Sequence, residues 1–101
     1  MSRKAESGSV RYAVIGLGHI AQVAVLPAFA HASENSQLTA LVSDDTEKLS
    51  TLQRRYGVEH AFNYQDLNDC LEHVDAVYIA LPNSMHGEFA VRAAEAGVHV
   101  L

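Results

Sequence analysis

The sequence contains no tryptophan, two prolines and one cysteine among its 101 residues. Because a disulfide needs two cysteines, no internal disulfide can form, and the redox compartment is left open. Cys70 lies in a short helix-like stretch, where we expect a buried, unreactive side chain. Basic residues are also few, since 7 Lys and Arg stand against 12 Asp and Glu, for a formal charge of −5. Such a chain has no positive field for nucleic acid or anionic membranes, so backbone donors must hold any phosphate-bearing ligand.

Long hydrophobic runs are missing as well. No apolar segment approaches the ~20 residues that a membrane span needs. The polar residues 1–9 include Arg3 and Lys4 but no apolar run behind them, which argues against a secretory signal. With 49% hydrophobic and 19% charged residues, the composition is typical of a globular protein. We expect a cytoplasmic protein with a disordered leader over residues 1–9 and a folded domain over residues 10–101.

Strand-like and helix-like segments alternate along the chain. Strands alternating with helices indicate a parallel sheet with right-handed crossovers, so the sequence predicts a Rossmann-type, doubly wound α/β fold with strand order 3-2-1-4-5. The final strand is the last thing in the sequence, and we therefore expect a longer parent chain with a further domain. The expected strands cover residues 10–15, 38–42, 61–62, 74–81 and 98–101, and the expected helices cover residues 19–32, 46–56, 65–72 and about 83–96.

Local signals refine the helices. Asp44 or Asp45 is expected to cap the helix over residues 46–56, which stops at Gly57. Asn83 or Ser84 is expected to cap the last long helix, which stops at Gly97. Pro27 lies inside the first helix and should bend it. Because the residues around Pro27 are apolar on all sides, that helix is expected to be buried on both sides, for instance by a second domain.

A glycine-rich turn joins the first strand to the first helix. Residues 16–21 read Gly-Leu-Gly-His-Ile-Ala, with the G-x-G-x-x-A spacing of a dinucleotide-binding turn. Gly16 permits the tight turn, Gly18 lets the backbone approach a pyrophosphate, and Ala21 lets the helix pack closely on the strand. The helix N-terminus adds unpaired N–H groups, to which His19 contributes its backbone more than its imidazole. A glycine turn without a ligand is the alternative.

The tip of the second strand decides between the two nicotinamide cofactors in folds of this kind. A carboxylate there accepts hydrogen bonds from a free 2′-hydroxyl and repels a 2′-phosphate. We place Ser43 at that tip, with Lys48 one turn into the next helix, and this pair favours NADP over NAD. Asp44 or Asp45 would reverse the preference if either pointed inward, although capping the helix is the role that we favour for them.

The strand over residues 74–81 ends in Leu81-Pro82-Asn83-Ser84-Met85-His86. Together with the glycine turn and the run Ala93-x-x-Ala96-Gly97-Val98-His99-Val100-Leu101, this segment resembles the Gfo/Idh/MocA oxidoreductases, and among them the glucose–fructose oxidoreductase-like branch. The resemblance runs from about Val10 to Leu101. Three motifs agree in order and spacing, which is more specific than the glycine turn alone.

The resemblance implies roles for individual residues. Gly16, Gly18, His19 and Ile20 would wrap the pyrophosphate, and Ser43 with Lys48 would take the adenosine ribose. Leu81, Pro82, Asn83 and His86 would lie at the nicotinamide end. From the residues alone, His86 could equally be a solvated histidine of the first helical turn, and Asn83 a helix cap.

The catalytic residues of the family are expected beyond Leu101, in a Glu-Lys-Pro motif and in a C-terminal α/β domain. The resemblance therefore implies the NAD(P)-binding domain of an oxidoreductase that transfers hydride between the cofactor and a sugar, polyol or related small molecule. Residues 1–101 alone should be inactive, and the parent should form homo-oligomers through its C-terminal domain. The alternative is a non-catalytic Rossmann module that senses a dinucleotide or binds a partner. No metal site is expected, because the spacing of His31, His60, His73 and His99 suits none.

Overall fold

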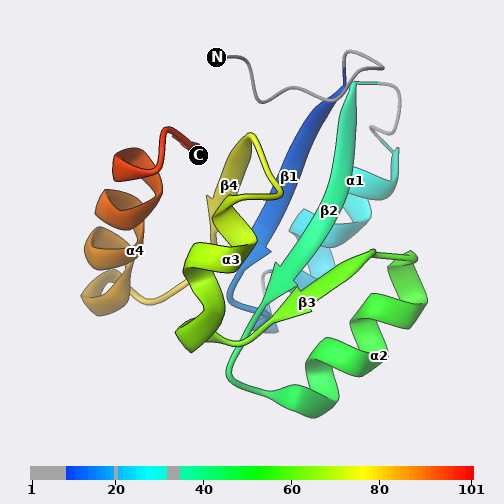
Figure 1. Ribbon diagram of the computed structural model, residues 1–101. Coiled ribbons are helices and arrows are strands. Elements are labelled where there is room, and N and C mark those ends of the chain that lie inside the picture. Colours follow the sequence, from blue (N-terminus) through cyan, green and yellow to red (C-terminus); the bar gives the residue numbers. More distant parts are fainter. Residues whose placement is uncertain (1–8, 20, 32–34) are drawn as a thin grey trace.

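The computed structural model describes residues 9–19, 21–31 and 35–101 (Figure 1). The predicted leader therefore lies outside the described residues, apart from Ser9. These described residues form five strands, one π-helix, one 3-10 helix and four α-helices, with strands and helices alternating along the chain. In chain order they are β1 (Val10–Ile15), η1 (Ala21–Val25), α1 (Leu26–His31), β2 (Ser36–Val42), α2 (Thr46–Tyr56), β3 (His60–Phe62), η2 (Tyr64–Asp66), α3 (Leu67–Leu71), β4 (Ala76–Ile79), α4 (Asn83–Glu95) and β5 (His99–Val100).

The five strands form one parallel sheet in the order β3-β2-β1-β4-β5. This confirms the predicted fold class and strand order. The chain leaves β1 toward β2 on one side and returns to β4 on the other, so the direction of winding reverses between β1 and β4. In an open α/β sheet, ligands bind at such a reversal, outside the carboxyl ends of the strands.

Each face of the sheet carries its own apolar layer. One layer joins β1, β2 and β4 to α3 and α4 through side chains such as Ile15, Val77 and Phe89. The other joins β1 and β2 to η1, α1 and α2 through Val14, Leu26 and others. The alternation of neighbouring residues Val14 and Ile15 between the two layers is the period of two that a strand imposes. The central strands are thus covered on both faces, as their near-continuous apolar sequence predicts.

Cys70 belongs to the first layer. Its side chain is 0% exposed, and burial raises the pKa of the thiol to about 12. A thiol with so high a pKa holds almost no thiolate at neutral pH and is a poor nucleophile. The expectation of a buried cysteine is confirmed, and the high pKa of its thiol agrees with the expected low reactivity.

The ends of α2 follow the predicted signals. Asp45 is the N-cap, and its Oδ1 accepts a hydrogen bond of 3.0 Å from the Lys48 backbone N–H. Gly57 terminates the helix in the left-handed conformation, at φ 63°. The two candidates for the cap are thereby separated, because Asp45 is engaged and Asp44 is left exposed.

The start of α4 differs from the prediction. The N-cap is Pro82, which makes no side-chain capping hydrogen bond, so the prediction of Asn83 or Ser84 as the N-cap residue is wrong. The Pro82 carbonyl accepts hydrogen bonds from the N–H groups of Met85 and His86 and so opens the first turn. Helix formation therefore begins at Asn83, directly after a proline whose fixed φ sets the entry of the chain. Strand β4 is also shorter than the predicted 74–81, because its pairing with β1 ends at Ile15 and Ile79.

The first helix is divided into two parts. A π-helical turn over Ala21–Val25 precedes α1, so Pro27 becomes the second residue of an α-helical segment. Proline has no N–H to donate to the preceding turn, and such interruptions of the α-helical hydrogen-bond ladder go with proline and with π-helical turns. The expectation of burial on both sides is wrong for this chain. Val25 and Leu26 face the sheet, but Val23 is 56% exposed, and Ala24 and Ala28 are exposed with it.

A charged pair joins the amino ends of β1 and β4. The Arg11 guanidinium donates to both carboxylate oxygens of Asp75, at 3.1 Å each, and the Arg11 backbone N–H donates to the same carboxylate at 2.8 Å. Asp75 is 5% exposed. This pair lies at the end of the sheet opposite the glycine turn. Within the described residues, no helix has the length and apolarity to cross a membrane.

Candidate functional site

Three predicted site segments meet at the carboxyl edge of the sheet: the glycine turn, the end of β2 and the segment after β4. Backbone hydrogen bonds tie the ends of the strands together in register: Gly16 N–H donates to Val42 O at 2.8 Å, and Ala80 N–H donates to Ile15 O at 2.8 Å. Ser43 N–H donates to Phe62 O at 3.1 Å. The glycine turn after β1 therefore lies between the segment after β2 and the segment after β4. Residues about 65 positions apart in sequence share one edge because parallel strands end on the same side.

Gly16 is required by the fold itself. Its φ of +95° belongs to a region that L side chains rarely adopt. A Cβ at this position would lie 2.7 Å from Ala80 O and 2.9 Å from Leu81 Cδ2. The missing side chain of Gly16 thus lets the turn pack directly against the end of β4, which brings the glycine turn into contact with the start of the Leu-Pro-Asn segment.

Gly18 presents the opposite case. Its φ lies outside the positive region, and among the described residues beyond its chain neighbours a Cβ built on it would meet no atom within 4 Å. Neither backbone strain nor packing against the described residues therefore explains a glycine here. Gly18 and the neighbouring His19 are both exposed at the edge of the sheet. Open space beside a glycine at a helix start is the arrangement that a close backbone approach to a phosphate requires. Ile20, the fourth predicted residue of the turn, lies outside the described residues.

At the predicted ribose end, Ser43 is almost fully buried, at 3% exposed. Its Oγ accepts a hydrogen bond of 3.1 Å from the Asp45 N–H and so shapes the turn between β2 and α2. Lys48 is exposed one turn into α2, next to that tip. The exposed carboxylate at the tip is Asp44, whose negative charge, after burial, is the second cause of the raised pKa of Tyr64.

At the predicted nicotinamide end, Leu81 is half-buried against the glycine turn and Pro82 is exposed. His86 is half-buried in the first turn of α4, and its backbone N–H donates to Pro82 O at 3.1 Å. The backbone of Asn83 begins α4 at the same edge. All described site residues thus lie on the segments that follow β1, β2 and β4.

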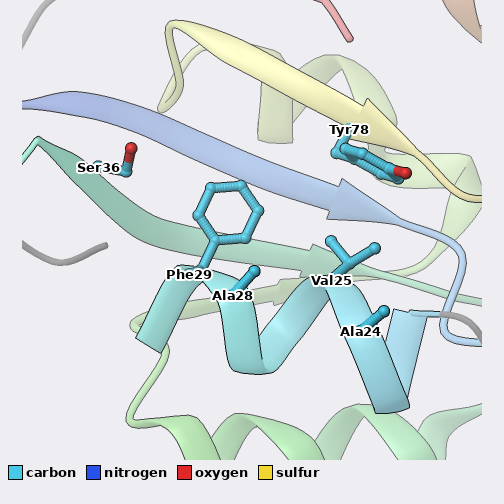
Figure 2. Close-up of a pocket in the computed structure, with 6 residues that line it drawn as sticks. All are labelled: Ala24, Val25, Ala28, Phe29, Ser36 and Tyr78. Carbon is cyan, nitrogen blue, oxygen red and sulfur yellow. The ribbon is translucent and has the colours of Figure 1, made fainter. Parts of the chain in front are cut away.

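An apolar hollow lies away from this edge. It encloses about 380 Å³ between the first helix and the sheet, on the face that carries α1 (Figure 2). Figure 2 shows Phe29 and Val25 pointing from the helix toward the strands, with Tyr78 on β4 beside them. The hollow contains none of the predicted site residues. Its lining residues are Ala24, Val25, Ala28, Phe29, Ser36 and Tyr78.

Two contacts at the carboxyl edge were not anticipated from the sequence. The Gln22 side-chain amide donates to the backbone carbonyl of Leu17, inside the glycine turn, at 2.9 Å. Tyr64, which follows β3, packs edge-on against Phe89 with ring centroids 5.3 Å apart and feels the charge of Asp44. Neither residue belongs to a spacing motif, and only the fold brings them to this edge.

Comparison with known proteins identifies the family. Residues 10–101 match the model of the oxidoreductase family with an NAD-binding Rossmann fold, Gfo/Idh/MocA. The chain belongs to this family. The predicted resemblance is therefore confirmed over the range expected from the sequence, and the chain is a dinucleotide-binding domain of the Gfo/Idh/MocA type.

Individual family members are similar over most of this chain. An aldose-aldose oxidoreductase from Caulobacter crescentus, solved with glycerol, shares 42% identity over 91% of the chain with a TM-score of 0.83. The 3-ketoreductase KijD10 from Actinomadura kijaniata, solved with TDP-benzene and NADP, shares 38% identity over 92% with a TM-score of 0.80. The NADP-dependent scyllo-inositol 2-dehydrogenase IolU of Bacillus subtilis shares 38% identity over 91%.

The chain spans only part of these proteins: 28% of the Caulobacter enzyme, 29% of KijD10 and 27% of IolU. All three are oxidoreductases by name, which favours the enzymatic prediction over a non-catalytic Rossmann module. The family is described as NAD-binding and KijD10 was solved with NADP, which agrees with the nicotinamide cofactor that the sequence predicts.

Proposed function

We propose that this chain binds NADP and NAD at the carboxyl edge of its sheet, as the cofactor-binding part of an oxidoreductase that acts on sugars or polyols. The observation that carries the proposal is the open space beside Gly18, at the point where the winding of the sheet reverses. The fold requires a glycine at position 16 but not at position 18. This combination suits a turn that is shaped to bind an anion.

Each segment of the edge takes one part of the cofactor in this proposal. Backbone N–H groups of Gly18 and His19, with Ile20, hold the pyrophosphate, while Gly16 sets the turn. Ser43 and Lys48 lie toward the adenosine ribose. Leu81, Pro82, Asn83 and His86 face the nicotinamide, which supplies hydride transfer when bound. The residues of this chain position the cofactor, and Leu81 shields the nicotinamide side of the turn from water.

Charge at the tip of β2 bears on the choice of cofactor. Lys48 attracts a 2′-phosphate and Asp44 repels it, whereas Asp45 is engaged in capping α2. Because Ser43 is buried, its contribution to a phosphate is limited to its hydroxyl proton and the shape of the turn. Relatives that use NADP support binding of NADPH at least as tight as that of NADH. Small-molecule substrates of the sugar or polyol class are proposed on the names of the same relatives.

Titration of the 101-residue protein with NADH and NADPH, followed by nicotinamide fluorescence, tests the proposal. Saturable binding of both, with NADPH at least as tight, is expected. Absence of binding would contradict the dinucleotide site, and a clear preference for NADH would contradict the assignment of Lys48. The parent protein should oxidise aldoses or polyols with NADP, whereas this chain alone should bind cofactor without turnover.

A further inference from the structure

We infer that Gln22 is a positioning residue for the phosphate-binding turn, fixing the direction in which the turn presents its N–H groups. The inference rests on the proposed function, since it concerns the same turn. Gln22 is half-buried in η1, five residues after Leu17. It contacts the turn twice, and both contacts reach backbone carbonyls.

The first contact is made by the side chain. Gln22 Nε2 donates to Leu17 O at 2.9 Å. Leu17 is 3% exposed, so its carbonyl has little access to water and depends on a partner within the protein. The second contact is made by the backbone, because Gln22 N–H donates to Gly18 O at 3.1 Å. Two consecutive carbonyls of the turn are thus directed toward the helix.

The direction of a carbonyl determines that of the next N–H. In a trans peptide unit the C=O of one residue and the N–H of the following residue point in opposite directions, and the described chain contains no cis peptide. By holding Leu17 O, Gln22 turns the Gly18 N–H away from the helix. By holding Gly18 O, it turns the His19 N–H the same way. Both donors then point away from the helix, at an edge of the sheet where Gly18 and His19 are exposed.

The same geometry keeps acceptors away from the ligand. A carbonyl oxygen turned toward a pyrophosphate would repel it, whereas preorganised N–H groups attract it at no cost of reorientation on binding. Without the Gln22 amide, the peptide unit between Leu17 and Gly18 is free to rotate. The Gly18 N–H would then have to be ordered when the cofactor binds, at a cost in affinity.

The test compares Gln22→Met with Gln53→Met. Methionine matches glutamine in length and removes the donor. Gln53 makes a similar bond, from its Nε2 to Glu59 O at 3.2 Å, but on α2 and away from the glycine turn. Gln22→Met should weaken binding of NADH, NADPH and inorganic pyrophosphate by about tenfold, the value of one hydrogen bond. Gln53→Met should change these dissociation constants by less than about twofold. Equal changes in the two variants would overturn the inference.

Two further measurements cover the remaining outcomes. In Gln22→Met, the amide resonances of Gly18 and His19 should shift in the ligand-free protein, and in Gln53→Met they should not; unchanged resonances in Gln22→Met would refute the inference. This readout stands even if the wild-type protein binds no dinucleotide, a result that would refute the proposed function instead. If Gln22→Met does not fold, hydrogen exchange in the wild-type protein tests the inference. The side-chain amide protons of Gln22 should exchange with water more slowly than those of the exposed Gln65. Equal exchange rates would refute the inference.

Discussion

The two glycines of the phosphate-binding turn should respond in opposite ways to the same substitution. Gly16→Ala places a Cβ in a backbone at φ +95° and 2.7 Å from Ala80 O, which is backbone and cannot rotate away. The positive φ costs about 1–3 kcal/mol, and the overpacked contact costs about another 1–3 kcal/mol. The sum of roughly 2–6 kcal/mol is a large part of the 5–15 kcal/mol that stabilises a typical domain. Gly16→Ala should therefore melt at least about 10 °C lower, or fail to fold.

Gly18→Ala should instead leave the fold intact. Its backbone lies outside the positive φ region and its Cβ would meet open space. The lower entropy of the unfolded chain should even add about 0.4–1 kcal/mol of stability. Binding of dinucleotide should nevertheless weaken at least about tenfold, since the methyl group occupies the space through which the phosphate approaches the backbone. Gly18→Val, with a larger side chain, should abolish binding.

Gly87→Ala is the matched control. Gly87 lies inside α4, and its Cβ would also meet no atom within 4 Å. Alanine there should raise the stability by roughly 0.5–1 kcal/mol and leave the dissociation constants unchanged. Thermal melts by circular dichroism and titrations by nicotinamide fluorescence measure both effects. If Gly18→Ala bound NADPH as tightly as Gly87→Ala, the argument that Gly18 serves a ligand would be refuted.

Three other outcomes are expected. Lys48→Gln should weaken the binding of NADPH several-fold and leave the binding of NADH unchanged, whereas Asp44→Asn should strengthen the binding of NADPH. The reason is that a unit charge about 4 Å from a phosphate is worth roughly 1 kcal/mol in water. Equal effects on the dissociation constants of both cofactors would contradict this assignment. Asp75→Ala should cost about 2–4 kcal/mol in urea unfolding, since it removes three hydrogen bonds that the buried Asp75 carboxylate accepts from Arg11; a loss under 1 kcal/mol would show that the pair is dispensable. Cys70 should resist thiol reagents in the native protein at pH 8 and react on unfolding. Because folding raises the pKa of its thiol to about 12, the unfolded state loses its proton first, so stability should fall as the pH rises above about 9; Cys70→Ala should remove this part of the pH dependence.

The sequence alone determined the fold class, the strand order and the family. Apolar runs alternating with amphipathic segments specify a parallel sheet, and the spacing of the glycine turn and of the Leu-Pro-Asn segment is local information. A cap at Asp44 or Asp45 and the stop at Gly57 could be predicted for the same reason, since each depends on a few neighbouring residues, and the structure decided between the two carboxylates in favour of Asp45. Prediction was wrong at the start of α4, where a proline with fixed φ displaced the side chains that usually cap helices.

Only the tertiary structure decided how the glycine turn is held. That Gly16 meets the end of β4 depends on β1 and β4 being neighbours in the sheet, a contact between residues about 65 positions apart. The hydrogen bond that Ser43 accepts from the Asp45 N–H and the exposure of Asp44 both follow from the path of the chain after β2. The hydrogen bond from Gln22 to Leu17 depends on the π-helical turn, whose wider winding no spacing rule anticipates. Spacing specifies which backbone the chain adopts, whereas the directions of individual N–H groups arise from contacts that exist only once the sheet and helices have packed.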